Sequence, residues 1–319
     1  MTAHINSERG GWQKPLVGVS VAQALAVADD DVGPRAEPIR SKRLTDTDWS
    51  VGTKAKLDGS RWRRNASHLG VAAIAALLLA ACGPAGGKLN ALRTLASTCP
   101  KNGKLAESVA LDVANNQRSP SLTTARLATI RNAATQIAVC GGHLRVVVFG
   151  ATAAASAAVY DGDLAPPGAT LNARLLRVPG IVDHVVTQVD HQIQLVVPKI
   201  DGQGDDPLSA LTAADQYMSE LGTGVSVRFV IETDGISSQT LILNSRTLTP
   251  HNAGTVASQI EVPDLSGSSI IFAGLGKVGA GSPPPSSFVE ALRTLYGDIC
   301  RRTHAATCLA LSDITPLAG

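Results

Sequence analysis

The sequence predicts an α/β domain built on a doubly wound, mostly parallel six-stranded sheet with helices on both faces. Short runs of consecutive apolar residues alternate with longer segments in which apolar residues recur at helical spacing. The apolar runs are nearly uninterrupted, as in strands that are buried on both faces. Capping residues and prolines stand where the helical segments begin. Strands that alternate with helices in this way form parallel sheets through right-handed crossovers.

Six apolar runs are the predicted strands: Val109–Val113, Leu144–Phe149, Ala157–Tyr160, Val225–Ile231, Ile270–Ala273 and Leu309–Leu311. The third run is expected to end at a turn at Asp161-Gly162.

Four helices are predicted between these strands. Ser119-Pro120 and Asp206-Pro207 each combine an N-cap residue with proline at the first helical position. The helix after Asp206 is expected to stop at Gly222. The other two helices are marked by apolar residues at helical spacing, over Ile181–Ile193 and Phe288–Ile299.

Composition excludes several classes of protein. The chain has 319 residues, 44% hydrophobic and 17% charged, which is unlike collagen, coiled coils and acidic disordered chains. Its formal net charge of +2 does not favour a nucleic-acid partner, because such proteins usually present a basic face. The stretch from Cys82 to Gly319 is long enough for one domain with a substantial core.

Residues 61–81 have the features of a signal peptide. Arg61, Arg63 and Arg64 precede an uncharged stretch from Leu69 to Ala81. That stretch is too short to span a bilayer, which takes about 20 helical residues. It does have the length of the apolar region of a signal peptide. The alternative is an ordinary hydrophobic helix with a buried cysteine.

The end of this segment, Leu79-Ala80-Ala81-Cys82, resembles a bacterial lipobox. The resemblance implies a diacylglycerol group on Cys82 and cleavage before it, which would anchor the protein on the extracytoplasmic face of the cell membrane. Residues 82–103 are then expected to be the lipidated cysteine and a tether, with Gly83–Gly87 flexible.

The polar residues 1–60 do not fit a signal peptide. Either the start site is assigned too early, with the true start near Val51, or the stretch is a disordered leader. The domain itself is expected at 104–319.

The cysteines fit an exported protein. Apart from Cys82 there are four, Cys99, Cys140, Cys300 and Cys308, and an even number outside the cytoplasm indicates two disulfides. Three pairings are open, and Cys99–Cys140 with Cys300–Cys308 is the most local. Four buried thiols are the alternative.

Acidic residues gather where ligands bind in such sheets, beyond the carboxyl ends of the strands. Asp112 lies at the end of the first predicted strand, and Asp234 lies just past the fourth. Asp205 and Asp206 stand at a helix start. If the first and fourth strands are neighbours, these carboxylates converge on one edge, where they would suit a hard divalent cation such as Mg²⁺.

Three segments resemble the von Willebrand factor A (VWA) domain in their order and spacing: Leu111–Asn116, Gly204–Leu208 and Val230–Gly235. In that family a metal-ion-dependent adhesion site takes ligands from an Asp-x-Ser-x-Ser strand end, a threonine and a later aspartate. The resemblance implies metal ligation by Asp112, Asn116, Asp205 and Asp234.

Two features depart from the family's pattern. Ala114 stands at a serine position and has no ligand atom, and Asp205 stands where the threonine belongs. The extra carboxylate either compensates for the lost hydroxyl or abolishes the open coordination position. The alternative is therefore a retired site whose aspartates only cap loops and helices.

Gly274-Leu275-Gly276-Lys277-Val278-Gly279 matches the pattern GxGxxG after a predicted strand. A dinucleotide site needs a helix directly after the glycines, and Gly281–Pro285 intervenes. We therefore expect a loop at the carboxyl edge in which Gly274, Gly276 and Lys277 shape a partner surface.

These features predict a membrane-anchored, exported protein whose VWA-like domain binds a protein or other macromolecule through a degenerate divalent-metal site. A metal-independent scaffold of the cell envelope is the second hypothesis, and an envelope enzyme is the third. We expect no enzymatic activity, because no GxSxG elbow or other catalytic motif is present.

Overall fold

The structure is a computed structural model that describes residues 84–101, 103–200, 204–236, 241, 243–279 and 281–314. The leader 1–60, the signal segment 61–81 and Cys82 lie outside the described residues. Within the described ranges, no helix has both the length and the apolarity needed to cross a membrane.

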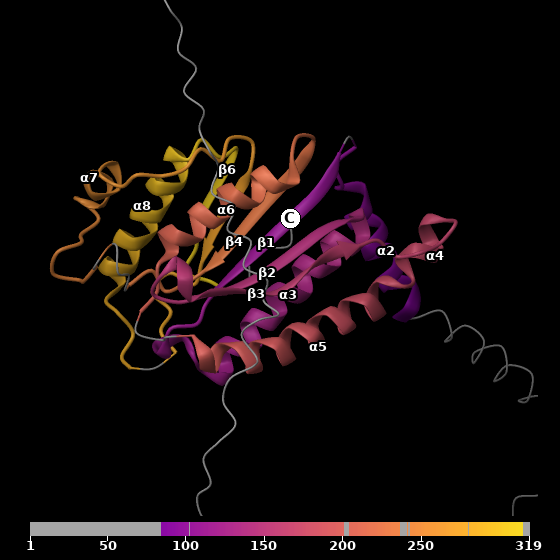
Figure 1. Cartoon of the computed structure of the whole chain (residues 1–319), viewed down its shortest axis with the longest axis horizontal. Helices are drawn as coiled ribbons and strands as arrows, with labels where there is room; N and C mark the ends of the chain where they lie inside the picture. The colour runs from indigo at the N-terminus through magenta and orange to yellow at the C-terminus, as the bar shows by residue number, and fades with distance from the viewer. Residues whose placement is uncertain are drawn as a thin grey trace, which may run out of the picture. The chain divides into compact units, whose positions relative to one another are not determined.

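Six strands form one sheet in the order β3-β2-β1-β4-β5-β6 (Figure 1). The central strand β1 pairs in parallel with β2 on one side and with β4 on the other, and the edge strand β3 is antiparallel to β2. The predicted VWA/Rossmann-like sheet, doubly wound and mostly parallel, is confirmed. The strands are β1 (Lys104–Asp112), β2 (Gly142–Phe149), β3 (Ser156–Leu164), β4 (Val225–Glu232), β5 (Ser269–Ala273) and β6 (Thr307–Ala310).

Strand β3 runs further than its apolar residues indicate. The turn predicted at Asp161-Gly162 is wrong, because both residues lie inside the strand. Asp161 is paired with Arg145 of β2, and an Arg145 Nη2 atom lies 2.9 Å from Asp161 Oδ2. An edge strand tolerates such charged residues, since part of its surface faces solvent.

Strand β1 begins five residues before its predicted start. Its first half contains Glu107, whose charge interrupts the apolar pattern. That carboxylate is buried and accepts a hydrogen bond from Arg228 of β4 at 2.6 Å, so the ion pair replaces an apolar contact.

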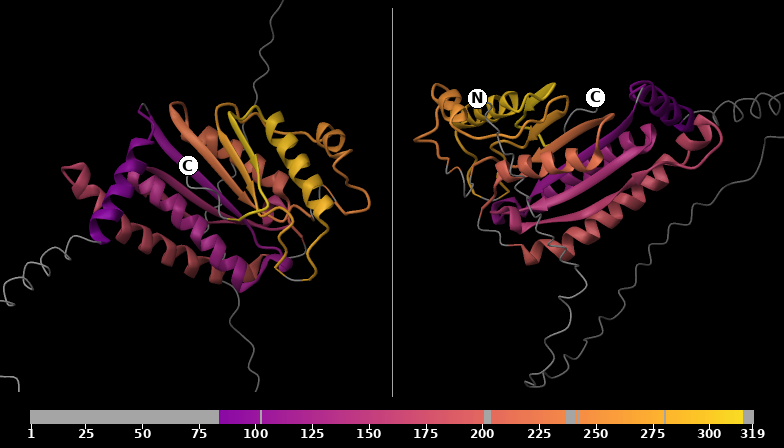
Figure 2. Two further views of the ribbon diagram at one scale, coloured as in Figure 1. Left: turned by 180° about the vertical axis from the view of Figure 1, so that it is seen from behind. Right: turned by 45° about the horizontal axis from the view of Figure 1, so that its top comes forward.

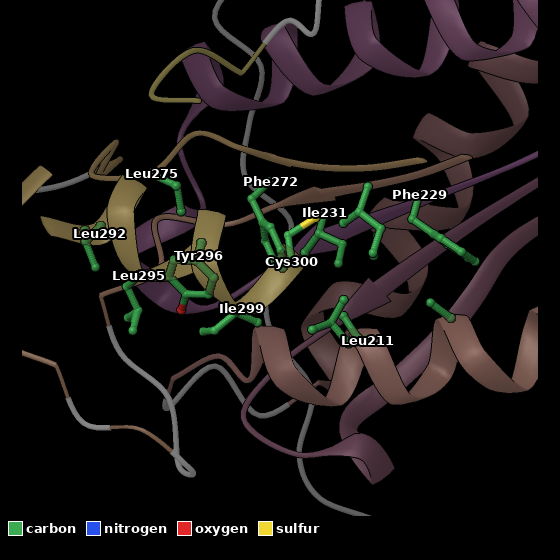
Figure 3. Packing of buried hydrophobic residues seen from close by; sticks show 14 of the residues in the cluster. Leu211, Phe229, Ile231, Phe272, Leu275, Leu292, Leu295, Tyr296, Ile299 and Cys300 are labelled. Atoms are coloured by element: carbon green, nitrogen blue, oxygen red, sulfur yellow. The ribbon is translucent and has the colours of Figure 1, made fainter. Parts of the chain in front are cut away.

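Helices cover both faces of the sheet (Figures 1 and 2). One core cluster joins the sheet to α3 and α5, with α2 packed at its margin, and the other joins it to α6, α7 and α8. Figure 3 shows the second cluster, in which Tyr296 and Phe272 lie with ring centroids 4.9 Å apart. The helices are α2 (Pro84–Ser97), α3 (Pro120–Cys140), α4 (Leu171–Leu175), α5 (Val178–Val196), α6 (Pro207–Leu221), α7 (Ala253–Ser258) and α8 (Ser286–Arg302).

Two of the predicted helix starts carry the expected caps. Ser119 accepts a hydrogen bond from the Leu122 amide, and Asp206 accepts one from the Leu208 amide. Because α3 and α6 both begin at the carboxyl edge of the sheet, these caps fix the loops that surround the acidic residues.

Most of the segment 82–103, expected to be a tether, forms a helix. Helix α2 begins at Pro84, and its Leu89, Leu92 and Leu95 pack against the α3–α5 side of the core. Partial burial of these leucines against the core favours a docked helix over the free chain that the glycines indicate.

Both disulfides have the local pairing. Cys99 and Cys140 are joined by an S–S bond of 2.02 Å, and Cys300 and Cys308 by one of 2.03 Å. The first bond ties the end of α2 to the end of α3 at the amino-terminal edge of the sheet. Closure of its loop stabilises the fold by about 4 kcal/mol in the chain-entropy model.

Candidate metal centre

Three of the four predicted ligand residues meet at the carboxyl edge of the sheet. Asp112 ends β1, Asp234 follows β4, and Asp205 immediately precedes the Asp206 cap of α6. All three residues are buried, and one carboxylate oxygen from each lies within 4.8 Å of the others. The neighbouring strands β1 and β4 bring Asp112 and Asp234 together, and the start of α6 adds Asp205. We call these three residues the acid triad.

Backbone and side-chain donors hold one side of each carboxylate. Asp112 Oδ1 accepts a hydrogen bond from the Ala114 amide at 2.8 Å, and Asp234 Oδ1 accepts one from the Ile236 amide at 2.9 Å. Asp205 Oδ2 accepts a hydrogen bond from the Thr233 hydroxyl at 2.5 Å. These bonds orient the acid triad without using all of its oxygen atoms.

Two buried oxygen atoms of the acid triad have no hydrogen-bond partner among the described residues. They are Asp112 Oδ2 and Asp205 Oδ1. A buried carboxylate oxygen without a donor is costly unless a proton or a cation faces it. These two atoms fit a metal ion, and without an ion they fit a proton shared between the carboxyl groups of Asp112 and Asp205.

Burial shifts Asp112 and Asp205 toward their protonated forms. It raises the pKa of Asp112 to about 6, and the charge of Asp234 adds to that shift. Burial raises the pKa of Asp205 to about 10, assisted by the charge of Asp112. The physical cause is the loss of water around several like charges, and a bound divalent cation would relieve it.

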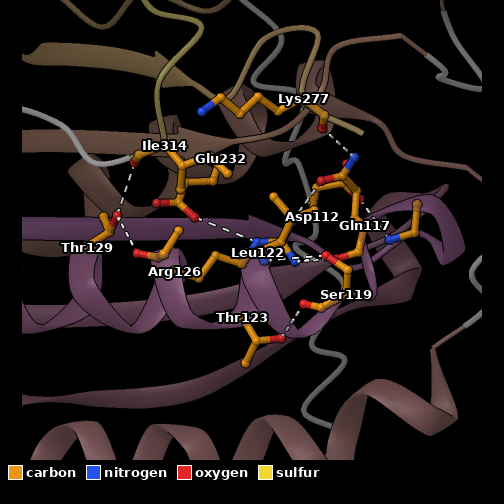
Figure 4. Close-up of polar contacts among 12 residues, drawn as sticks. Asp112, Gln117, Ser119, Leu122, Thr123, Arg126, Thr129, Glu232, Lys277 and Ile314 are labelled. Carbon is orange, nitrogen blue, oxygen red and sulfur yellow. Dashed lines mark hydrogen bonds and ion pairs between the residues drawn. The ribbon is translucent and has the colours of Figure 1, made fainter. Parts of the chain in front are cut away.

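A buried arginine lies beside the acid triad (Figure 4). Arg126 of α3 donates to the Gln117 carbonyl at 3.0 Å and to Gln117 Oε1 at 3.2 Å, and its Nε lies 3.7 Å from Glu232 Oε2. Burial raises the pKa of Glu232 to about 7. Arg126 offsets one negative charge of the cluster formed by Glu232 and the acid triad, so a divalent cation is still electrostatically favourable there.

Gln117 connects this arginine to the acid triad. Its Nε2 donates to Asp234 Oδ2 at 2.8 Å and to the Lys277 carbonyl at 3.0 Å (Figure 4). Gln117 thus orients Asp234 while its own carbonyl groups are held by Arg126. An outer residue of this kind sets the direction of a metal ligand.

Sequence analysis missed Gln117, Arg126 and Thr233. One signal was available for Arg126, which lies in the apolar stripe of α3 between Leu122 and Ile130. A lone charge inside such a stripe indicates a buried polar partner. Gln117 and Thr233 carry no comparable signal, because their partners come from other elements.

Asn116, the fourth predicted ligand, lies in the short 3-10 helix Asn115–Gln117. The position of its side chain lies outside the described residues, so its role as a ligand stays a prediction. Ala114, at the lost serine position, contributes its amide to Asp112 instead of a hydroxyl to a metal.

The glycine loop after β5 lies against the acid triad. The Gly276 amide donates to the Asp234 carbonyl at 2.8 Å, and Lys277 Nζ lies 3.1 Å from Asp313 Oδ1. Gly276 has a positive φ of 79°, and a β-carbon there would lie 2.6 Å from a methyl group of Val289. Helix α8 begins only at Ser286, so the helix that a dinucleotide site needs does not follow the glycines directly.

Comparison with protein-family models and with curated protein sequences finds no match. Among solved structures, the chain is similar to the vWF domain of the type V pili tip protein Mfa5 from Porphyromonas gingivalis. The TM-score is 0.37 at 8% identity, over 69% of this chain and 93% of that one.

Two further solved structures are similar to this chain over smaller shares of their own length. The pilus adhesin SpaC from Lactobacillus rhamnosus GG gives a TM-score of 0.37 at 9% identity, over 67% of this chain and 28% of SpaC. Manganese-loaded TRAP protein from Plasmodium vivax gives 0.30 at 13% identity, over 60% of this chain and 63% of TRAP. The chain spans 23% of a three-domain Mfa5 structure. At these levels of similarity, the fold assignment rests on the strand order of this chain itself.

Proposed function

We propose that this chain is an exported, lipid-anchored binding protein whose VWA-like domain holds a divalent cation at Asp112, Asp205 and Asp234. Through that ion it binds an acidic group of a protein or other macromolecular partner. The observation that carries the proposal is the pair of buried, unpartnered oxygen atoms, Asp112 Oδ2 and Asp205 Oδ1. We propose a binding role rather than an enzymatic one.

The donor set selects the kind of ion. Carboxylate oxygens are hard ligands that suit Mg²⁺, Mn²⁺ and Ca²⁺. Mg²⁺ keeps several coordination positions for water or for a ligand when the protein supplies few carboxylates. A bound ion would present positive charge at an edge of the sheet that otherwise carries an excess of negative charge, and this favours an acidic partner group.

Thermal unfolding of the full chain with Mg²⁺, Mn²⁺ or Ca²⁺, each against EDTA, tests the metal site. An ion at 100 times its dissociation constant stabilises the folded state by about 2.7 kcal/mol, so the melting temperature should rise. Asp205→Asn should abolish the rise, because it removes one of the two unpartnered carboxylate oxygens.

Glu290→Gln is the matched control, since Glu290 is an exposed acid of α8. It should keep the full response to the ion. An equal rise in the parent and in Asp205→Asn, or no rise with any of the ions, would contradict the metal site.

A second candidate function is a metal-independent scaffold that uses the same fold. It is favoured by the two donors already committed to the acid triad, the Gln117 amide on Asp234 and the Thr233 hydroxyl on Asp205. Binding of the partner in EDTA, unchanged in Asp205→Asn, would support it.

The proposed anchor is the lipidated thiol of Cys82, which would hold the domain on the extracytoplasmic face of the membrane. Two or more acyl chains give stable membrane attachment, whereas one is marginal. In Cys82→Ala, metabolic labelling with a fatty acid should therefore be lost, and a salt wash should release the protein from the membrane fraction, whereas the lipid-anchored parent should resist it. Labelling that persists in Cys82→Ala would contradict the anchor.

A further inference from the structure

A basic surface lies at the amino-terminal edge of the sheet. Two stretches form it, residues 84–106 and 163–183, and together they contain six lysines or arginines against two aspartates, Asp163 and Asp183. All six basic side chains are exposed: Lys88, Arg93, Lys101, Lys104, Arg174 and Arg177. The rest of the chain is nearly balanced, because the overall 28 Lys and Arg and 26 Asp and Glu leave 22 and 24 outside these two stretches.

Two large apolar side chains are exposed on the same surface. Leu176 is 68% exposed and Leu171 is 43% exposed, and both belong to the region of α4. Helix α2 lies beside α4, and Arg93 Nε donates to Asn172 Oδ1 at 3.1 Å (Figures 1 and 2). We call Leu171, Leu176 and the cations Lys88, Arg93, Arg174 and Arg177 the amino-edge patch.

The amino-edge patch and the acid triad lie at opposite ends of the sheet. Strand β3 ends at Leu164, which is paired with Gly142 at the beginning of β2, so α4 follows at the amino-terminal edge. Asp112 lies at the other end of β1. If the amino-edge patch contacts a surface, the acid triad faces away from that surface.

We propose that the amino-edge patch docks on the surface of a lipid bilayer that contains anionic headgroups. Leu171 and Leu176 would enter the interface, and the surrounding cations would contact the headgroups. The inference rests on the anchor proposed above, and it adds a contact made by the folded domain itself.

Three features favour a bilayer as the occupant of this surface. Exposed leucines among exposed cations that outnumber the neighbouring acids match the composition of interfacial membrane-binding segments. Cationic side chains near an anionic membrane strengthen binding by about fivefold each. Helix α2 also begins at Pro84, two residues after the thiol expected to carry the lipid, so the anchor would hold this end of the domain at the membrane.

Hydrogen exchange of the full chain carrying Cys82→Ala tests the docking, because no acyl chain then contributes. Vesicles of phosphatidylglycerol and phosphatidylcholine should slow amide exchange in residues 165–177, and vesicles of phosphatidylcholine alone should slow it much less. Exchange around the acid triad should not change. Equal exchange in residues 165–177 with and without anionic vesicles would overturn the proposal.

Matched charge variants of the same full chain give a second readout. Lys88→Gln with Arg174→Gln should weaken sedimentation with anionic vesicles by about 25-fold, at about fivefold per charge. The control, Lys199→Gln with Arg246→Gln, removes two exposed cations outside the patch and should bind like its parent. Leu171→Ser with Leu176→Ser should also weaken binding while the melting temperature stays within a few degrees of the parent's.

The outcomes separate this inference from the proposed function. All of these measurements are made in EDTA and on protein without an acyl group on Cys82. Their results therefore do not depend on whether the metal site binds an ion or whether Cys82 is lipidated. If both charge pairs weaken binding equally, or neither does, the amino-edge patch is not the docking surface.

Discussion

Strand β1 carries two buried acids whose surroundings are opposite. Glu107, in the middle of the strand, lies against Arg228 of β4, whose Nη2 also donates to Gln136 Oε1 at 2.5 Å. Asp112, at the end of the same strand, lies against two more carboxylates. The charge of Glu107 is thus balanced by Arg228 of the neighbouring strand. The charge of Asp112 is available to a proton or a metal ion.

The difference separates structural charge from charge available for binding. The Glu107–Arg228 pair joins β1 to β4, and its two charges offset each other within the fold. The acid triad lies beyond the strand ends, away from such a cation, and among the described residues Arg126 compensates part of its charge. The three predictions below test this contrast, beginning with the largest effect.

The first prediction concerns pH. In EDTA, the free energy of unfolding should fall as the pH rises from 6 to 8. Because Asp205 has a folded pKa raised to about 10, the folded state keeps a proton that the unfolded state has lost. One such group changes the stability by up to about 1.4 kcal/mol per pH unit, or about 3 kcal/mol over this range.

Urea unfolding at several pH values measures this slope. Asp205→Asn should flatten it, and saturating Mg²⁺ should flatten it in the parent, since the ion takes the place of the proton. A slope that is the same in the parent and in Asp205→Asn would show that Asp205 is not the group responsible.

The second prediction is that Glu107→Ala lowers the free energy of unfolding by about 2 kcal/mol, because it leaves the charge of a buried ion pair without its partner. The Arg228 side chain is 19% exposed and keeps Gln136, so the loss should lie below that of a fully buried pair. Asp205→Asn in EDTA should have the opposite sign, because the amide is neutral without the proton that Asp205 must take up on folding. If both substitutions destabilise the domain equally, the contrast between the two acids is wrong.

The third prediction is that Gln117→Leu weakens divalent-cation binding about tenfold, the effect expected when the partner of a metal ligand is lost. Without the amide, Asp234 Oδ2 loses the hydrogen bond from Gln117, while the acid triad itself is intact. Isothermal titration with Mn²⁺ measures the change. Gln194→Leu, at an exposed position of α5, is the control and should bind Mn²⁺ as the parent does.

Much of the fold follows from local sequence patterns. Each of the six strands overlaps a predicted apolar run, and capping residues mark the starts of α3 and α6. The limits of β1 and β3 do not follow, because their polar halves are stabilised by pairs with β4 and β2. Helix α2 was missed for a related reason, since docking of its leucines on the core outweighs its glycines.

The sequence by itself determined the alternation of strands and helices, the placement of Asp112 and Asp234 at strand ends, and the candidate local disulfides. Only the tertiary structure decided which oxygen atoms of the acid triad lack a partner, and that Gln117 and Arg126 support it. The hydrogen bond from Gln117 to Asp234 joins residues 117 positions apart in the chain. Such contacts depend on the order of the strands and on burial, which set distance and solvation together, and no local pattern of residues encodes either one.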